Sequence, residues 1–200
     1  PKLTLKAIFK TRGVLWGILT LGAYCAAEFT LGTWGASFLV NARGFSEDGA
    51  ALAVSAFFGG IMIGRFIAGI AAVKLSDNTL IRIGLILVIP GLILLAVPMG
   101  MEGAVAAFMI IGAGMGPVFP SVLHTVPARF GARFAADITG YHMGGAYVAG
   151  FAVQFAFGFV AAELGYAFMS YMLIFFIALT FVLNEVTIRV TSKNKAENNG

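Results

Sequence analysis

Residues Gly13–Val40 read GVLWGILTLGAYCAAEFTLGTWGASFLV, an apolar stretch with one acidic residue, Glu28, and no basic one. The hydrocarbon core of a bilayer is about 30 Å thick, and a helix needs about 20 residues to cross it. This stretch is therefore long enough to span a membrane. Further apolar runs of similar length follow along the chain, and the sequence predicts six spanning helices: Gly13–Val40, Ala50–Ala72, Thr79–Met99, Gly103–Leu123, Ile138–Ala162 and Tyr166–Ile188.

The composition excludes the other common classes of protein. The 200 residues are 60% hydrophobic and 11% charged, whereas soluble domains are about 45–50% apolar and about 25% charged. The 19 Phe residues and the few charges are the reverse of a disordered composition, and the lone Cys25 rules out a disulfide framework. The runs also lack the strict alternation of barrel strands. We therefore expect an all-α integral membrane protein.

Basic residues indicate the orientation. With an even number of spans, all of the 13 Lys and Arg residues except Arg43 and Arg65 fall on the side that holds both termini. The positive-inside rule assigns that side to the cytoplasm. We expect a multi-pass protein of the cell (inner or plasma) membrane with both termini cytoplasmic. No nucleic acid partner is implied, because the sequence has no basic patch with interleaved aromatic residues.

The chain divides into three parts. Residues 1–12 form a basic cytoplasmic linker, which we expect to be a juxtamembrane segment cut from a longer chain, because Pro1 is not an initiator Met. Residues 13–190 form the six-helix transmembrane domain. Residues 191–200 are polar, and we expect them to form a disordered cytoplasmic tail.

Glu28 is the main candidate for function, because an ionisable side chain inside a span is costly and normally faces a wet cavity or the bundle interior. It lies about 22 Å along the axis from the start of its span. Thr20, Tyr24 and Glu28 share one helix face. Because burial disfavours a charged carboxylate, Glu28 could bind and release a proton under physiological conditions. The alternative is a permanently protonated Glu28 that bonds to a neighbouring helix.

Arg65 is the second ionisable residue inside a span, about 10 Å from the nearer end of its helix. The axial estimates separate it from Glu28 by about 12 Å, so we do not expect a direct pair. We expect a structural charge that snorkels or pairs with Asp77 or Asp137; a contact with substrate is the alternative. Asp137 lies at the start of the fifth span. A carboxylate is favourable at a helix N-terminus, and this position alone explains the presence of an acid there.

The fifth span carries weaker signals. Tyr147 and Gln154 are seven residues apart and so lie on one face. We take both, together with Tyr24 and Glu28, as candidates to line a substrate cavity. His142 is expected to be a packing residue, and no His or carboxylate cluster has metal-ligand spacing.

Glycine and proline shape the spans. The fourth span contains Gly112-Ala-Gly-Met-Gly-Pro-Val-Phe-Pro120, in which Pro117 and Pro120 each remove a backbone donor. We expect a broken helix with a hinge at Gly116, Pro117 and Pro120. Small residues at four-residue spacing also predict close helix packing; the pairs are Gly60 and Gly64, Gly112 and Gly116, and Gly140 and Gly144.

A short internal similarity suggests a repeat. Phe57-Phe-Gly-Gly60 in the second span resembles His142-Met-Gly-Gly145 in the fifth. Each lies in the second helix of a group of three. This placement is typical of a three-plus-three inverted repeat.

Three segments carry a recognisable pattern: Tyr24-Cys-Ala-Ala-Glu28 with Gly32-Thr-Trp34, Ser55-Ala-Phe-Phe-Gly-Gly60 with Gly64-Arg65 and Gly69, and the Gly112–Pro120 stretch. Together they resemble the C-terminal six-helix half of a major facilitator superfamily transporter. The first two are similar to sugar permeases of the fucose–galactose–glucose:proton symporter type. One motif departs from the family, because Gly69 is followed by Val73-Lys74 and an acid comes only at Asp77. The departure puts in doubt the cytoplasmic contact that this loop makes in other members of the family.

The resemblance implies a twelve-helix working protein, of which this chain supplies six helices. An N-terminal six-helix half, in the same longer chain or a separate one, would be its partner. Substrate would bind between the halves, and alternating access would rock one against the other. The first, second, fourth and fifth spans would border the cavity.

The expected function is secondary active transport of a small polar solute, with sugars as one candidate class, coupled to protons through Glu28. The partners would be the bilayer, the solute and protons. Two alternatives stay open: an exporter of amphipathic compounds, and a six-helix protein that works as a homodimer. An intramembrane enzyme is not expected, because the spans offer one buried acid rather than a catalytic pair. We expect no catalytic residues, cofactor or metal.

Overall fold

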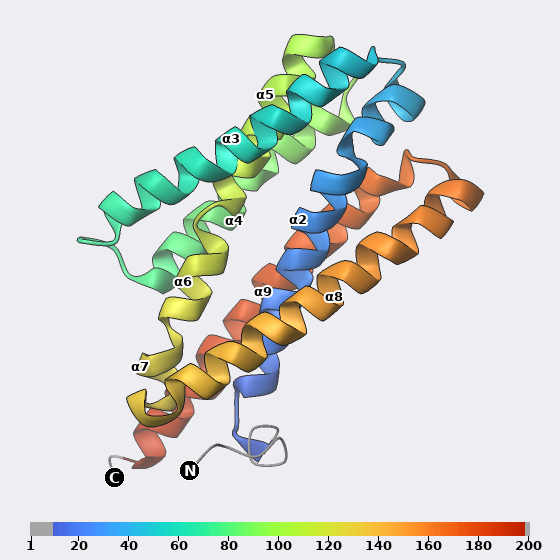
Figure 1. Ribbon diagram of the computed structural model, residues 1–200. Helices are drawn as coiled ribbons and strands as arrows, with labels where there is room; N and C mark the ends of the chain where they lie inside the picture. The colour runs from blue at the N-terminus through green and yellow to red at the C-terminus, as the bar shows by residue number, and fades with distance from the viewer. Residues whose placement is uncertain (1–9, 199–200) are drawn as a thin grey trace.

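The computed structural model describes residues 10–198, with side chains as far as residue 192. Six of its helical segments are long and apolar enough to cross a membrane, which confirms the all-α membrane fold. Short connections join them (Figure 1). The helices are α2 (Val14–Arg43), α3 (Glu47–Ala71), α4 (Asp77–Ala96), α5 (Met101–Met115), α6 (Val118–His124), α7 (Val126–Phe130), the 3₁₀ helix η1 (Ala132–Phe134), α8 (Ala135–Leu164) and α9 (Phe168–Asn198).

Local sequence sets several helix ends. The Ser46 and Ser76 side chains cap α3 and α4 by accepting hydrogen bonds at 3.3 Å from the backbone N–H groups of Gly49 and Thr79. Helix α2 stops at Gly44, whose φ of 71° is in the left-handed region that glycine tolerates. These signals lie at the polar loops, so each apolar run begins and ends near the membrane boundary.

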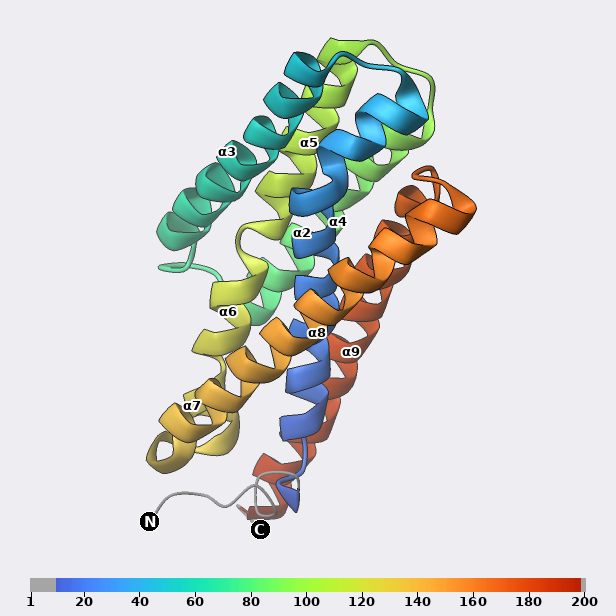
Figure 2. The same cartoon turned by 45° about the vertical axis from the view of Figure 1, so that its right-hand side comes forward.

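The six spans interlock as two groups of three. Helix α2 packs mainly against α8 and α9, while the fourth span, α5 to α7, packs mainly against α3 and α4 (Figures 1 and 2). The first helix of each group therefore packs on the second and third helices of the other group. This exchange agrees with the predicted grouping of the spans into three plus three.

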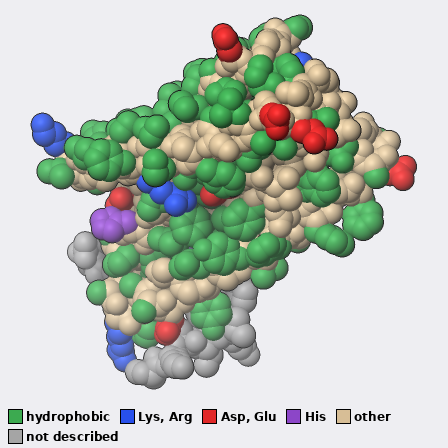
Figure 3. Space-filling model, turned by 45° about the horizontal axis from the view of Figure 1, so that its top comes forward, with side chains coloured by type: hydrophobic (Ala, Val, Ile, Leu, Met, Phe, Trp, Pro, Cys, Tyr) green, Lys and Arg blue, Asp and Glu red, His purple; other side chains and the backbone are tan. Residues whose placement is uncertain are grey.

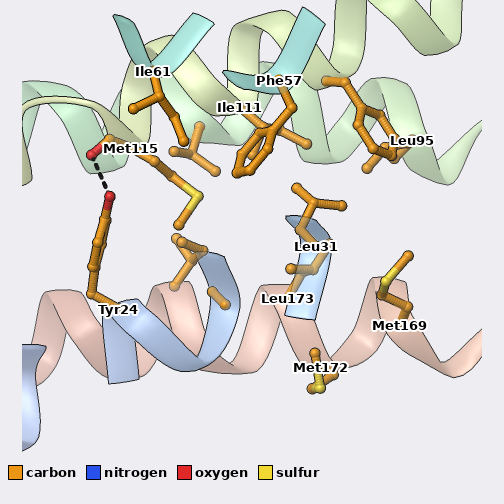
Figure 4. Packing of buried hydrophobic residues seen from close by; sticks show 14 of the residues in the cluster. Tyr24, Leu31, Phe57, Ile61, Leu95, Ile111, Met115, Met169, Met172 and Leu173 are labelled. Carbon is orange, nitrogen blue, oxygen red and sulfur yellow. Dashed lines mark hydrogen bonds between the residues drawn. The ribbon is translucent and has the colours of Figure 1, made fainter. Parts of the chain in front are cut away.

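The main buried cluster lies where α2, α3, α5 and α9 meet. Phe57 and Ile61 from α3 pack toward Ile111 and Met115 from α5, with Leu31 of α2 opposite them (Figure 4). Large apolar side chains fill this space, so the centre of the half-molecule is packed and polar groups lie on its margins.

Helices α3 and α5 approach at backbone distance through glycines. A Cβ atom on Gly60 would lie 2.9 Å from the backbone nitrogen of Ala113, and one on Gly116 would lie 2.6 Å from the carbonyl oxygen of Ile61. The predicted packing role of Gly60, Gly64, Gly112 and Gly116 is therefore confirmed. The same prediction is wrong for Gly140 and Gly144: a Cβ on either would meet no atom within 4 Å in the described part of the chain.

Helix α9 differs from the expectation at its end. It continues to Asn198, into the segment 191–200 that was predicted to be a disordered tail. Lys, Ala and Glu, which occupy positions 193 and 195–197, are strong helix formers, so polarity alone did not end the helix. The predicted linker, residues 1–12, lies mostly outside the described residues.

The outer surface suits a bilayer. Large apolar side chains such as Met62, Phe66 and Phe155 are exposed, and Figure 3 shows hydrophobic side chains spread over much of one face. A soluble monomer rarely exposes so much contiguous apolar surface. The exposure is explained by contact with acyl chains or with other membrane helices.

The glycine contact between α3 and α5 can be tested by adding one methyl group. We expect Gly60→Ala to destabilise the protein by about 1–3 kcal/mol, as overpacking usually does. Gly59→Ala is the matched control, because a Cβ there meets no atom within 4 Å in the described residues. Thermal unfolding in detergent would measure both, and an equal loss in the two variants would contradict the close contact.

Candidate functional site

The fourth span is broken where its sequence predicts. Helix α5 ends at Met115, Gly116 and Pro117 form the junction, and α6 begins at Val118. Proline has no N–H to donate and weakens the helix at that point. A second interruption, at Thr125 ahead of Pro127, divides α6 from α7, just past Leu123, where the fourth span was predicted to end. Movement at a hinge of Gly116, Pro117 and Pro120 stays a prediction.

Tyr24 fastens α2 to this break. Its hydroxyl donates a hydrogen bond of 3.0 Å to the backbone carbonyl of Met115, the last residue of α5 (Figure 4). The side chain is fully buried. The prediction that Tyr24 lines a substrate cavity is therefore wrong for this structure: its face of α2 meets the end of α5 there, instead of an open space.

Glu28 lies one turn further along α2 and pairs with Arg65 of α3. Oε1 of Glu28 is 4.0 Å from Nη2 of Arg65, and their side chains are 14% and 49% exposed. The expectation that the two would not meet is wrong. The expectation compared the depths of the two residues along their helix axes, as if both helices ran perpendicular to the membrane. In the structure α3 runs obliquely to α2 (Figure 1), and the two long side chains close the remaining gap.

The helix break holds both members of this pair in place. A Cβ on Gly116 would lie 2.9 Å from the backbone nitrogen of Arg65, so the junction touches α3 at the residue that carries the guanidinium. The carbonyl of Met115, the preceding residue, holds Tyr24 one turn before Glu28. One short irregular segment therefore contacts both helices beside the residues that carry the acid and the base.

The Glu28–Arg65 pair borders a hollow of about 270 Å³ that Tyr147 of α8 also lines. The ring of Tyr147 stacks on Phe29 at 6.0 Å between centroids and on Phe119 at 6.3 Å. The hydrophobic rings hold the phenol beside the pair, and its side chain is partly exposed. Of the four predicted cavity residues, Glu28 and Tyr147 come together here.

Gln154 lies in a second hollow, of about 540 Å³, two turns along α8. Its Oε1 accepts a hydrogen bond of 2.8 Å from the Thr33 hydroxyl, and its backbone carbonyl accepts one of 2.9 Å from Nε1 of Trp34. Both hollows lie along the contact of α2 with α8. Trp34 therefore bridges α2 and α8 through its indole N–H.

Asp77 is not the partner of Arg65. Its carboxylate is 2.8 Å from Nδ1 of His124, at the end of α6, although Arg65, Asp77 and His124 all border one hollow of about 260 Å³. Beside them Arg129 donates a hydrogen bond of 2.7 Å to Oδ1 of Asn78. The expected pairing of Arg65 with Asp77 is therefore corrected, since the nearer Glu28 holds the guanidinium.

Asp137 and His142, the other two polar residues of α8 that the sequence singled out, lie away from the two hollows along α2 and α8. Asp137 lies in the first turn of α8. His142 is buried, and its Nδ1 is 2.9 Å from the carbonyl of Ile138. Within the described residues no group of three or more His, Cys, Asp and Glu side chains gathers as metal ligands would.

Comparisons with known proteins agree with this geometry. Residues 1–154 match the family model of the Major Facilitator Superfamily, and no match was found among curated proteins. A crystal structure of a point variant of the E. coli fucose:proton symporter, FucP, superposes with a TM-score of 0.74 at 16% identity. A crystal structure of the superfamily transporter FucP in the outward conformation superposes with a TM-score of 0.76 at 15% identity.

These structures are about twice as long as this chain. The superpositions cover 92% of this chain, but only 46% and 45% of the two symporter chains. At such low identity they establish the fold, and the family model establishes descent. The chain belongs to the major facilitator superfamily of membrane transporters.

Proposed function

We propose that this chain is one half of a secondary active transporter that moves a small polar solute by alternating access, coupled to protons. The observation that carries the proposal is the Glu28–Arg65 pair, 4.0 Å apart beside a hollow at a broken helix. Ionisable groups inside membrane spans are rare and mark substrate and proton pathways. Membership of the superfamily supports the transport activity, and the pair offers a way to couple proton movement to solute movement.

Protonation of Glu28 would change what Arg65 binds. While the carboxylate is charged, it attracts the guanidinium; when it takes up a proton, the attraction is lost. Arg65, whose side chain is half-exposed, is then available to hydrogen-bond a solute in the hollow. Loss of the proton restores the pair and releases the solute, so proton and solute movements are linked.

Two observations support a class of solute: the polar groups that line the hollow, and the similarity of the fold to FucP. The hollow presents a carboxylate, a guanidinium and the phenol of Tyr147 among aromatic rings, a combination that suits hydroxyl groups on an apolar ring face. The FucP structures are of a fucose:proton symporter. We therefore propose a sugar or a similar polyol as the solute.

The working protein would contain a second set of six helices. The chain spans about half of each matched structure, so the partner proposed is an N-terminal six-helix half. The hollows along α2 and α8 would then face this partner, with the Gly116–Pro117 junction as hinge. The excess of basic residues at the end where α2 begins and α9 ends supports a cytoplasmic location for that end.

Uptake assays with the whole protein in proteoliposomes would test the solute class. We expect accumulation of a sugar under an imposed inward proton gradient and no transport of lipophilic cations. Transport of lipophilic cations without sugars would favour an exporter of amphipathic compounds. Full activity of this chain by itself would favour a homodimer.

Glu28→Gln tests the coupling role. We expect it to abolish accumulation against a gradient, because no proton can be carried, while exchange of internal for external solute continues. Glu163→Gln is the matched control, since Glu163 is an exposed acid near the end of α8. Accumulation by Glu28→Gln that equals the wild type at every pH would remove Glu28 from coupling.

Substitutions of Arg65 test the pair itself. Arg65→Lys keeps the charge, so we expect it to retain part of the accumulation, whereas Arg65→Gln leaves Glu28 without its partner. The loss of stability in Arg65→Gln should be smaller than the about 3–5 kcal/mol of fully buried pairs, because Arg65 is half-exposed. The double variant Glu28→Gln with Arg65→Gln should recover that stability in thermal unfolding. No recovery would show that the two side chains do not interact.

A further inference from the structure

A long apolar groove separates α4 from α9 on the outside of the half-molecule. It has a volume of about 540 Å³, and its walls are Leu85, Ile89 and Ile93 on one side and Ile174, Ala178 and Phe181 on the other. Several of these side chains are half-exposed. The groove therefore opens to the surroundings of the helices, which for a membrane-spanning protein are lipid.

The length of the groove matches one leaflet. Its lining residues on α4 run from Leu85 to Ala96, which is about 16 Å at 1.5 Å per residue. Half of a hydrocarbon core is about 15 Å thick. One acyl chain lying along the groove would therefore fill it.

An ion pair closes the groove at one end. Arg82 donates from Nε to Oε1 of Glu185 at 2.6 Å and from Nη2 to Oε2 at 2.8 Å. Arg82 lies one turn before the groove residue Ile86, and Glu185 lies one turn after Phe181. The pair is thus at the end of the groove nearer the membrane boundary, where α4 begins.

The charges at this end do not cancel. Arg189 follows Glu185 by one turn on the same face of α9 and is exposed, so two guanidinium groups flank one carboxylate. The bonds to Glu185 use two of the five N–H donors of Arg82, and its side chain is 44% exposed. A phosphate oxygen is the ligand that such a half-exposed guanidinium binds well.

We propose that the α4–α9 groove binds one anionic phospholipid. One of its two acyl chains lies between the two helices, and its phosphate lies between Arg82 and Arg189 at the end closed by Glu185. The net positive charge favours a headgroup that is negative overall to a zwitterionic one. The site is distinct from the Glu28 hollow, because the two have no lining residue in common.

Lipid retention measures this selectivity. The whole protein would be reconstituted with equal amounts of phosphatidylglycerol and phosphatidylcholine that carry identical acyl chains, and the lipids that remain bound would be counted by native mass spectrometry. We expect the wild type to retain an excess of phosphatidylglycerol. Loss of one of the two arginines should lower that excess about fivefold, the effect of one basic residue near an anionic headgroup.

Three variants separate the site from general charge attraction. Arg189→Gln removes one charge and leaves the Arg82–Glu185 pair intact, so it is a safer test of charge than Arg82→Gln, which breaks the pair. Arg133→Gln removes an exposed charge from η1, where the guanidinium of Arg133 lies over the ring of Phe134. This variant should retain the same excess of phosphatidylglycerol as the wild type. Ala178→Trp fills the groove without changing charge and should also lower the excess.

The outcomes decide the proposal. Loss of the excess in Arg189→Gln and Ala178→Trp but not in Arg133→Gln supports it. Equal retention of both lipids by the wild type overturns it, and so does an equal effect of Arg133→Gln and Arg189→Gln. If Ala178→Trp retains the full excess, no acyl chain lies in the groove and the proposal also fails.

Discussion

The backbone contact of α5 with its neighbours is the constraint on which the rest of the structure depends. Membrane helices can approach this closely only where side chains are absent, and glycines face α3 and α4 on two sides of α5. The end of α5 then lies against the backbone of Arg65, and its last carbonyl holds Tyr24. The relative position of Glu28 and Arg65 follows from these two contacts. A charged pair inside a membrane is tolerated because each charge offsets part of the other's desolvation cost.

The first helix of each group of three packs on the second and third helices of the other group, and the two sides of the molecule differ in character as a result. The side on which α2 meets α3 and α8 carries the hollows, the acid and its partner. The side on which α4 meets α9 carries an apolar groove with charges only at its end. Polar chemistry and lipid contact are thus kept apart by the packing order. A rocking motion of the half against a partner would alter the first side and leave the second in the same lipid surroundings.

The sequence predicted the spans well and the site in part. Hydropathy locates six helices because lipid imposes one length scale on each, and Gly116 with Pro117 predicts the break because both weaken a helix locally. Small-residue spacing identified Gly60 and Gly116 as contacts, but the same spacing misassigned Gly140 and Gly144, because it does not say which face a neighbour occupies. The Glu28–Arg65 pair was missed because it depends on helix tilt and side-chain reach, which are tertiary properties. Tyr24 was misplaced for the same reason: its face was known, but not that α5 ends against it.

The central claim is that the Glu28 carboxyl takes up and releases a proton and is paired with Arg65 only while it is ionised. Infrared difference spectroscopy of the protein in membranes, recorded between acidic and alkaline buffers, observes protonated carboxyl groups directly. The account predicts a carboxylic acid band that is gained reversibly on acidification across the physiological range and is absent when Glu28 is replaced by Gln. A difference spectrum that is the same for the wild type and for Glu28→Gln would contradict it, because Glu28 would then be always protonated or always ionised.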